Sequence, residues 1–173
     1  DWYRGTADAL YQNLSIMKLH NPRFVLVLAG DHIYKMDYGP MLAFHVESRA
    51  DITVGVVEVP REDAKGFGVM TIDDGQRVVK FNEKPANPDC MPGREDMSLG
   101  SMGIYVFNAR LLFKLLEADA ADPDSAHDFG KNIIPSLIHS APVYSYRFYD
   151  ENKKAAKYWR DSGTLDAYFD ASM

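Results

Sequence analysis

The stretch Phe24-Val25-Leu26-Val27-Leu28-Ala29-Gly30-Asp31-His32 decides the fold of this chain. Its first six residues form a continuous apolar run that is too short for a typical helix, and Asn21-Pro22 separates the run from the residues before it. Such a run is typical of a strand that is buried on both faces, as strands are in a parallel sheet. We therefore expect an α/β domain in which this strand is central.

Helical and strand patterns alternate on both sides of this stretch, without repeats or low-complexity tracts. Helical spacing of apolar residues predicts helices over about 6–19, 39–48, 109–118 and 131–139, and a last helix from Thr164. Extended patterns predict strands over 52–59, 101–107 and 143–148, and a hairpin with arms at 69–72 and 77–81. Prolines predict a loop over 85–97. The alternation predicts an α/β fold with a mixed, mostly parallel sheet flanked by helices.

Composition excludes several classes of protein. The chain has 173 residues, which is the size of one domain. Hydrophobic residues make up 46% of it and charged residues 25%, which is an ordinary globular composition. The net charge of −6 offers no electrostatic footprint for nucleic acid or an anionic membrane, so we expect neither as a partner. No apolar stretch reaches the roughly 18 residues of a membrane helix. Cys90 is the sole cysteine, which excludes an internal disulfide and fits a reducing, cytoplasmic compartment.

Two aspartates are candidate metal ligands. Asp31 follows the apolar strand and Gly30, and ligands of open α/β sheets bind outside the carboxyl ends of strands. Asp161 lies near the C-terminus. Two carboxylates 4 Å apart repel by about 4 kcal/mol at an effective dielectric constant near 20, so a converged pair would imply a shared Mg²⁺. The alternatives are a turn cap at Asp31 and a helix cap at Asp161.

Three further segments carry candidate ligand contacts. In Glu83-Lys84-Pro85 the proline restricts the backbone of Lys84, which could contact a phosphate, while Glu83 could accept sugar hydroxyls. The segment from Gly5 to Asp8 opens a helix, where free N–H groups suit a base or phosphate. Ser101 lies among small residues before a strand. The alternatives are a solvated ion pair, a helix cap and an ordinary entry into a strand.

Other catalytic patterns are poorly supported. The sequence has no G-x-x-x-x-G-K-[ST] phosphate loop, no G-x-G-x-x-G fingerprint, no G-x-S-x-G elbow and no H-E-x-x-H pair. His127-Asp128 could form an acid–base pair, but a cap for the helix that starts near Phe129 is the favoured interpretation.

Seven motifs, taken in order, are far more specific than any one of them. They are Trp2-Tyr3-Arg4-Gly5-Thr6-Ala7-Asp8-Ala9, Leu28-Ala29-Gly30-Asp31-His32-Ile33-Tyr34-Lys35-Met36-Asp37-Tyr38, Phe67-Gly68-Val69-Met70, Glu83-Lys84-Pro85-Ala86-Asn87-Pro88, Ser101-Met102-Gly103-Ile104-Tyr105-Val106-Phe107, His127-Asp128-Phe129-Gly130-Lys131 and Tyr158-Trp159-Arg160-Asp161-Ser162-Gly163-Thr164. The series spans nearly the whole chain and closely resembles the glucose-1-phosphate adenylyltransferase (ADP-glucose pyrophosphorylase) family in its bacterial form.

The resemblance implies a Rossmann-like nucleotide-diphospho-sugar transferase fold and a reaction of ATP with α-D-glucose 1-phosphate that gives ADP-glucose and pyrophosphate, in glycogen or starch synthesis. It implies Mg²⁺ as the cofactor. The roles that it assigns to matching residues are these: Asp31 as catalytic Mg²⁺ ligand, Asp161 as second metal ligand, Lys84 as a catalytic and phosphate-binding residue, Tyr3, Gly68, Glu83 and Ser101 as further glucose 1-phosphate contacts, and Gly5, Thr6, Ala7 and Asp8 beside the nucleotide.

The chain departs from the family pattern at both ends. The first strand of the family with its Gly-rich, Arg-containing nucleotide loop, and the C-terminal left-handed β-helix, have no counterpart here. We therefore expect residues 1–173 to be a partial catalytic domain of a homotetrameric parent. A relative that uses UTP, dTTP or GTP, a catalytically silent regulatory subunit and a sugar-phosphate-binding fragment are the alternatives. The Trp2-Tyr3-Arg4 and His127–Gly130 motifs favour the adenylyl member.

Overall fold

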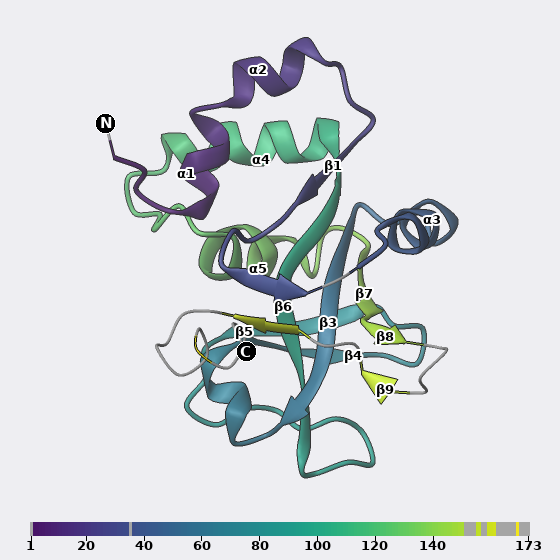
Figure 1. Ribbon diagram of the computed structural model, residues 1–173. Coiled ribbons are helices and arrows are strands. Elements are labelled where there is room, and N and C mark those ends of the chain that lie inside the picture. The colour runs from purple at the N-terminus through teal and green to yellow at the C-terminus, as the bar shows by residue number, and fades with distance from the viewer. Residues whose placement is uncertain (1, 35, 151–154, 157–158, 162–168, 170–173) are drawn as a thin grey trace.

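The computed structural model describes residues 2–34, 36–150, 155–156, 159–161 and 169 (Figure 1). It confirms a mixed α/β fold, in which helices flank a six-stranded sheet. The strand order is β5-β4-β6-β3-β7, with β1 also paired to β6. The strands are β1 (Phe24–Val27), β3 (Ile52–Pro60), β4 (Gly68–Ile72), β5 (Val78–Glu83), β6 (Met97–Asn108) and β7 (Val143–Arg147).

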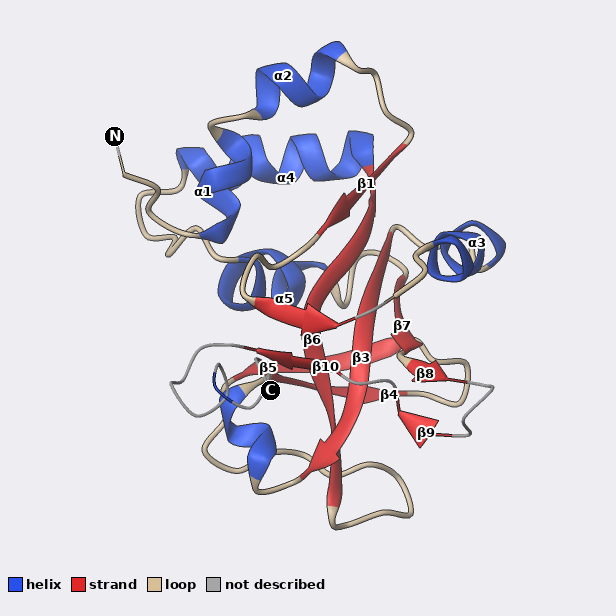
Figure 2. Cartoon of the chain, in the orientation of Figure 1, coloured by secondary structure: helices blue, strands red, loops and turns tan. Residues whose placement is uncertain are grey.

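The pairing of the described strands corrects the expectation of a mostly parallel sheet. β6 is antiparallel to β1, β3 and β4, and β4 is antiparallel to β5. Within the described sheet, β3 and β7 make the single parallel pair. β1, β3 and β4 all run in the same direction, but β6 lies between β3 and the other two and runs the opposite way (Figure 2). Each of the three therefore pairs with β6 in antiparallel fashion, and none pairs with another of the three in the part of the sheet that the structure describes.

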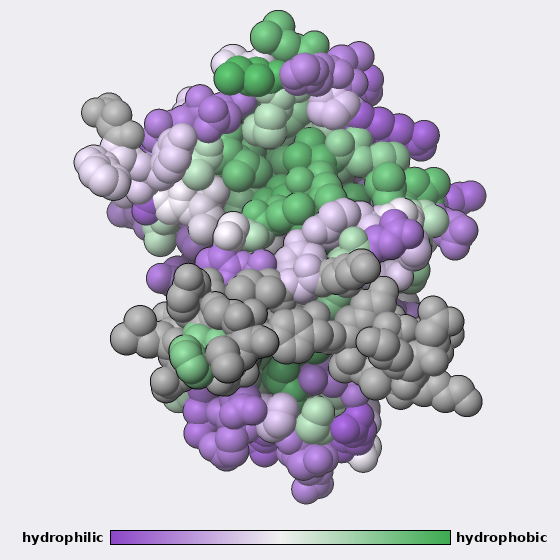
Figure 3. Space-filling view, in the orientation of Figure 1, coloured by the Kyte–Doolittle hydropathy of each residue, from purple (hydrophilic) through white to green (hydrophobic). Residues whose placement is uncertain are grey.

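The strand at the centre of the prediction is shorter and less buried than expected. β1 ends at Val27, two residues before the end of the apolar run, and Leu26 and Leu28 are exposed. Among the described strands β1 pairs with β6 alone, so its other edge is not covered by a neighbour in the sheet. Figure 3 shows a hydrophobic surface over this strand.

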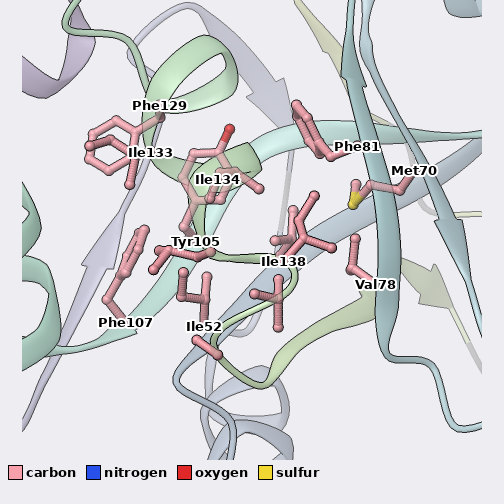
Figure 4. Close-up of a cluster of buried hydrophobic side chains, with 14 of the residues drawn as sticks. Ile52, Met70, Val78, Phe81, Tyr105, Phe107, Phe129, Ile133, Ile134 and Ile138 are labelled. Atoms are coloured by element: carbon pink, nitrogen blue, oxygen red, sulfur yellow. The ribbon is translucent and has the colours of Figure 1, made fainter. Parts of the chain in front are cut away.

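The core has two layers because side chains of β6 alternate between the two faces of the sheet. Tyr105 and Phe107 belong to the larger cluster together with the aromatic ring of Phe129 (Figure 4). Leu112 of helix α4 (Ala109–Ala121) belongs to the same cluster. Ile104 belongs to a second cluster with α3 (Gly39–Glu47). Burial of each such side chain contributes about 1.5–3 kcal/mol.

The helix predicted over 6–19 is two helices, α1 (Thr6–Tyr11) and α2 (Leu14–Leu19). Asn13 explains the break: its side chain Nδ2 donates to the carbonyl of Ala9 at 2.9 Å, the group that a continuous helix would pair with the Asn13 backbone N–H. The predictions of α3 and α4 are confirmed, with α4 three residues longer than expected.

The helix predicted over 131–139 begins earlier. A π-helical turn covers Phe129–Ile133 and continues as α5 (Ile134–Leu137). The hairpin is confirmed, and its second strand extends to Glu83. The last helix, predicted from Thr164, lies outside the described residues apart from position 169.

Small elements complete the described chain. They are the 3-10 helix over Asp63–Gly66 and the strands β2 (His32–Tyr34), β8 (Tyr149–Asp150), β9 (Ala155–Ala156) and β10 (Trp159–Asp161). None of the helices in the described ranges has the length and apolar character needed to cross a membrane.

Candidate active site

A cavity of about 380 Å³ lies where the sheet divides. β6 pairs with β1 through residues 105–108 and with β4 through residues 99–100, so in the described sheet neither strand covers residues 101–104 on that side. The cavity is lined by the end of β1 and the segment that follows it, by the last residue of β5, by α1, by β6 and by the start of the π-helical turn. Two strands thus present their carboxyl ends to it, the position expected for a ligand site in an α/β sheet.

Gly103 of β6 forms part of the cavity floor. Its φ of 66° lies in the left-handed region, which favours glycine. A Cβ atom at this position would lie 3.1 Å from Cε1 of His32 and 3.4 Å from Cβ of Ala29. The glycine therefore allows β6 to approach the segment after β1 closely.

Asp31 lines the cavity, and 63% of its side chain is exposed. One of its carboxylate oxygens, Oδ1, lies 3.5 Å from Nε2 of His32. β2 and β10 are antiparallel, and Asp161 is directly opposite His32 in their register. The backbone therefore brings residue 161 next to the segment of Asp31; the side chain of Asp161 lies outside the described residues.

Mg²⁺ fits the chemistry and exposure of Asp31. The described residues include no cluster of three His, Cys, Asp or Glu side chains that could hold a metal ion. Mg²⁺ needs fewer protein ligands, because it usually keeps several waters and takes one or two carboxylates together with substrate phosphates. Asp31 is exposed to the cavity and carries hard oxygen donors, so it suits this mode of binding.

Glu83 enters the cavity from the end of β5, opposite Gly68 of β4. A Cβ atom at Gly68 would lie 2.9 Å from the Oε2 atom of Glu83, and a Cβ atom at Gly130 would overlap the same oxygen. The two glycines therefore leave the space that the carboxylate occupies. Burial raises the pKa of Glu83, the negative charge of Asp128 raises it further, and the ammonium groups of Lys84 and Lys131 oppose this.

Lys84 follows Glu83 with an exposed side chain and a strained backbone. Its φ of 46° is left-handed, which is costly for a residue other than glycine, and it differs from the extended conformation that a following proline favours. The backbone N–H of Lys84 donates to the carbonyl of Phe67 at 3.0 Å. This hydrogen bond ties the strained residue to the segment before β4.

Ser101 and Tyr105 lie on β6 beside the cavity. Ser101 is inside a strand that begins at Met97, so the predicted entry loop is wrong here. Its hydroxyl lies 3.5 Å from that of Tyr105 and accepts the N–H of Gly103 at 3.3 Å. The Tyr105 ring stacks on Phe129 with centroids 5.6 Å apart, and burial is the main cause that raises the pKa of Tyr105 to about 12.

The buried side chain of Asp8 holds the start of α1 in place through three hydrogen bonds. Asp8 accepts hydrogen bonds from the backbone N–H and the guanidinium of Arg4 and from the amide of Gln12, at 2.9, 3.2 and 2.9 Å. These bonds, the backbone one first, lower the pKa of Asp8 to about 2. The side chains of Asp8 and Ala7 are buried, whereas Thr6 lines the cavity. The N-cap residue is Gly5 and no side chain caps α1, so Asp8 instead ties Arg4, which lies ahead of the helix, to the first helical turn.

The remaining members of the predicted set lie at the margin. Tyr3 is exposed outside the cavity lining, and its hydroxyl lies 3.5 Å from Nδ2 of Asn13. Gly5 packs against the backbone of His127, where a Cβ atom would overlap the carbonyl oxygen. The structure thus gathers Asp31, Glu83 and Thr6 around one cavity and places Tyr3 beside α1.

Asp128 is the residue whose place in the cavity the sequence did not reveal. The predicted cap is confirmed, since its Oδ1 accepts the N–H groups of Gly130 and Lys131 at 2.9 and 3.0 Å. Asp128 also lines the cavity with Glu83 and accepts the Thr6 hydroxyl at 3.1 Å. The one local signal in the sequence is Gly130, two residues after Asp128, because the missing side chain leaves room for the carboxylate of Glu83 beside Asp128.

Comparison with known proteins agrees with this site. The family model described as nucleotidyl transferase matches residues 2–173. The glucose-1-phosphate adenylyltransferase of Paramagnetospirillum magneticum is 55% identical over 100% of this chain and 41% of its own length. The glucose-1-phosphate adenylyltransferase 2 of Alkalilimnicola ehrlichii is 58% identical over 99% of this chain and 40% of its own. The chain therefore spans about two fifths of these relatives, and they confirm the resemblance carried by the motifs.

Proposed function

This chain belongs to the nucleotidyl transferase family, and we propose that the protein transfers the adenylyl group of ATP to α-D-glucose 1-phosphate, giving ADP-glucose and pyrophosphate. The observation that carries the proposal is identity of 54–58% across the chain to proteins named glucose-1-phosphate adenylyltransferase. The cavity supports it, because Glu83 at the end of β5, Asp31 after β1 and Asp128 present carboxylates to a space of ligand size.

The sugar phosphate is proposed to bind beside Glu83. A carboxylate there can accept hydrogen bonds from sugar hydroxyls, and Asp128 lines the same cavity. Lys84, the next residue, would contact the phosphate as a point charge. Gly68 provides room for Glu83, while Ser101 supports Tyr105. Tyr3 belongs to this proposal through the family resemblance alone.

The nucleotide is proposed to lie along the start of α1. Thr6 lines the cavity, whereas Gly5, Ala7 and Asp8 would act by holding this segment in place. Because the carboxylate of Asp8 is occupied by Arg4 and Gln12, its role is to fix the backbone near the nucleotide.

The reaction needs two anions to be positioned for an in-line displacement. A phosphate oxygen of glucose 1-phosphate attacks the α-phosphorus of ATP, a new P–O bond forms, and the bond to the leaving pyrophosphate breaks. Lys84 holds the attacking phosphate, and Asp31 and Asp161 are the proposed ligands of Mg²⁺. When bound, Mg²⁺ supplies positive charge that stabilises the transferring group. Orientation of the reactants provides the remaining advantage.

We further propose that the intact protein is a homotetramer in the cytoplasm. The tetramer rests on the family resemblance alone. The compartment agrees with Cys90, which is a free and exposed thiol.

A pyrophosphate-release assay of the intact protein tests the proposal. Glucose 1-phosphate and Mg²⁺ are supplied with ATP, UTP, dTTP or GTP in turn, and we expect release with ATP to be the fastest. Preference for another nucleotide would replace the adenylyl assignment. Binding of glucose 1-phosphate without release of pyrophosphate from any nucleotide would show a silent, sugar-phosphate-binding protein.

A further inference from the structure

Three residues are hydrogen-bonded to one another where α4 ends and the chain leads to the π-helical turn: Asp119 in the last turn of α4, and Ser125 and His127 in the segment that follows. Asp119 Oδ2 lies 2.8 Å from Nδ1 of His127, and Asp119 Oδ1 accepts the hydroxyl of Ser125 at 2.6 Å. The backbone N–H of His127 donates to Oγ of Ser125 at 3.0 Å. Only 7% of the Asp119 side chain and 5% of the His127 side chain are exposed. These three residues form a closed hydrogen-bonded ring, the 119–125–127 clamp.

The clamp holds His127 in a backbone conformation that needs support. The φ of His127 is 54°, in the left-handed region, where a residue other than glycine has a higher conformational energy. The clamp binds this residue twice, through its ring and through its N–H. The direction of the chain after His127 therefore depends on these contacts.

The first consequence concerns α1. The carbonyl of His127 accepts the N–H of Ala7 at 2.8 Å, and Gly5 packs directly against that carbonyl. In Figure 1 the segment that follows α4 lies beside the start of α1. The position of the clamp thus sets the position of the segment that we assign to the nucleotide side.

The second consequence concerns Asp128, the next residue in the chain. Its carboxylate accepts the Thr6 hydroxyl and caps the π-helical turn, and its charge acts on Glu83. The Thr6 hydroxyl in turn accepts the N–H of Phe129 at 3.1 Å. Both sides of the cavity are therefore tied to the chain immediately after the clamp.

We infer that Asp119, Ser125 and His127 are positioning residues, which set the nucleotide side of the site through the His127 carbonyl and the sugar side through Asp128. None of the three lines the cavity, so they act through other residues. The inference rests on the proposed function for its effect on substrates. The hydrogen bonds themselves do not depend on the identity of the substrates.

Asp119→Asn in the intact protein tests the clamp. Asparagine keeps the size of the side chain but removes the charge and replaces one carboxylate oxygen with an NH2 group, so the arrangement in which one oxygen faces Ser125 and the other faces His127 is lost. We expect the KM values for ATP and for glucose 1-phosphate each to rise about tenfold, with kcat changed by less than about twofold. Amide hydrogen exchange at Ala7 and Gly130 should become faster.

The matched control is Asp124→Asn, which removes the same charge from an exposed side chain five residues away. It should leave both KM values and both exchange rates unchanged. Ser125→Ala is the second variant, for the case that Asp119→Asn does not fold. It removes two of the three hydrogen bonds and keeps the contact between Asp119 and His127. Both KM values should then lie above those of the wild type, by less than about tenfold.

The outcomes separate this inference from the proposed function. Lower thermal stability with unchanged KM values and unchanged exchange at Ala7 would show that the three residues are merely structural. A wild-type protein that releases no pyrophosphate from ATP would refute the proposed function. Faster exchange at Ala7 in Asp119→Asn, but not in Asp124→Asn, would then still establish that the clamp holds the start of α1.

Discussion

The carboxylates of Glu83 and Asp128 face one cavity from the end of β5 and from the start of the π-helical turn, and the charge of Asp128 raises the pKa of Glu83. These residues are far apart in the chain, and Gly130 leaves the space that the Glu83 carboxylate occupies beside Asp128. The two negative charges repel each other, and the ammonium groups of Lys84 and Lys131 oppose this effect on Glu83.

Glu83→Gln should stabilise the protein at pH 7. The pKa of Glu83 is raised above its ordinary value of 4.5, mainly by burial, so the folded state binds more protons than the unfolded state as pH rises past 4.5. The folded protein therefore becomes less stable as the pH rises above 4.5 and Glu83 ionises. Glutamine cannot ionise, so the variant does not lose this stability. Melting temperatures measured from pH 4 to 8 should be higher for the variant than for the wild type at pH 7, and this difference should disappear toward pH 4. Exposed Glu95→Gln is the control, and a difference independent of pH would contradict the assignment.

Gly130→Ala should weaken binding of glucose 1-phosphate. The added methyl group would overlap Oε2 of Glu83, so the carboxylate must move, and overpacking of this kind costs about 1–3 kcal/mol. We expect the KM for glucose 1-phosphate to rise about tenfold, measured by steady-state kinetics. Gly66→Ala is the matched control, since a Cβ atom there meets nothing within 4 Å. Equal behaviour of the two variants would refute the steric argument.

Asp31→Asn should abolish most turnover and spare binding of glucose 1-phosphate. Asparagine keeps the shape of the side chain but removes the charge proposed to hold Mg²⁺, and we expect kcat to fall at least about 100-fold. Calorimetric titration with glucose 1-phosphate should give a dissociation constant close to that of the wild type. Asp74→Asn, in the exposed turn of the hairpin, is the control. Unchanged turnover would remove Asp31 from catalysis.

Lys84→Ala should raise the KM for glucose 1-phosphate more than the KM for ATP. A charge-assisted contact with phosphate contributes about 1.5–3 kcal/mol, which corresponds to at least about tenfold in affinity. Lys80→Ala is the control, because Lys80 lies on β5, just before Lys84 in the chain, and pairs with Asp89 at 2.7 Å. An effect confined to ATP would assign Lys84 to the nucleotide.

Asp8→Asn should destabilise the protein near neutral pH. Hydrogen bonds from Arg4 and Gln12 lower the pKa of Asp8 from 3.8 to about 2, so the ionised carboxylate stabilises the fold above pH 3.8 and this contribution is lost as pH falls toward 2. The melting temperature of the variant should be lower at pH 7, and the difference should shrink at pH 3. Asp63→Asn, which is exposed, should melt like the wild type at both pH values.

The local patterns predicted much of the secondary structure. The helices α3 and α4 and the hairpin of β4 and β5 are confirmed, because apolar spacing and turn residues act within a few positions of the chain. The break at Asn13 was missed although its cause is local, since the side chain competes for a backbone carbonyl that helical spacing does not register.

The order of motifs was sufficient to identify the family, because each motif carries its chemistry in a few consecutive residues. Tertiary structure alone decided the directions of the strands, the burial of Asp8, the register that puts Asp161 opposite His32, and the meeting of Glu83 with Asp128. Such contacts join residues tens of positions apart, and they form only when packing of the whole sheet and its helices overcomes the entropy of closing the chain between them.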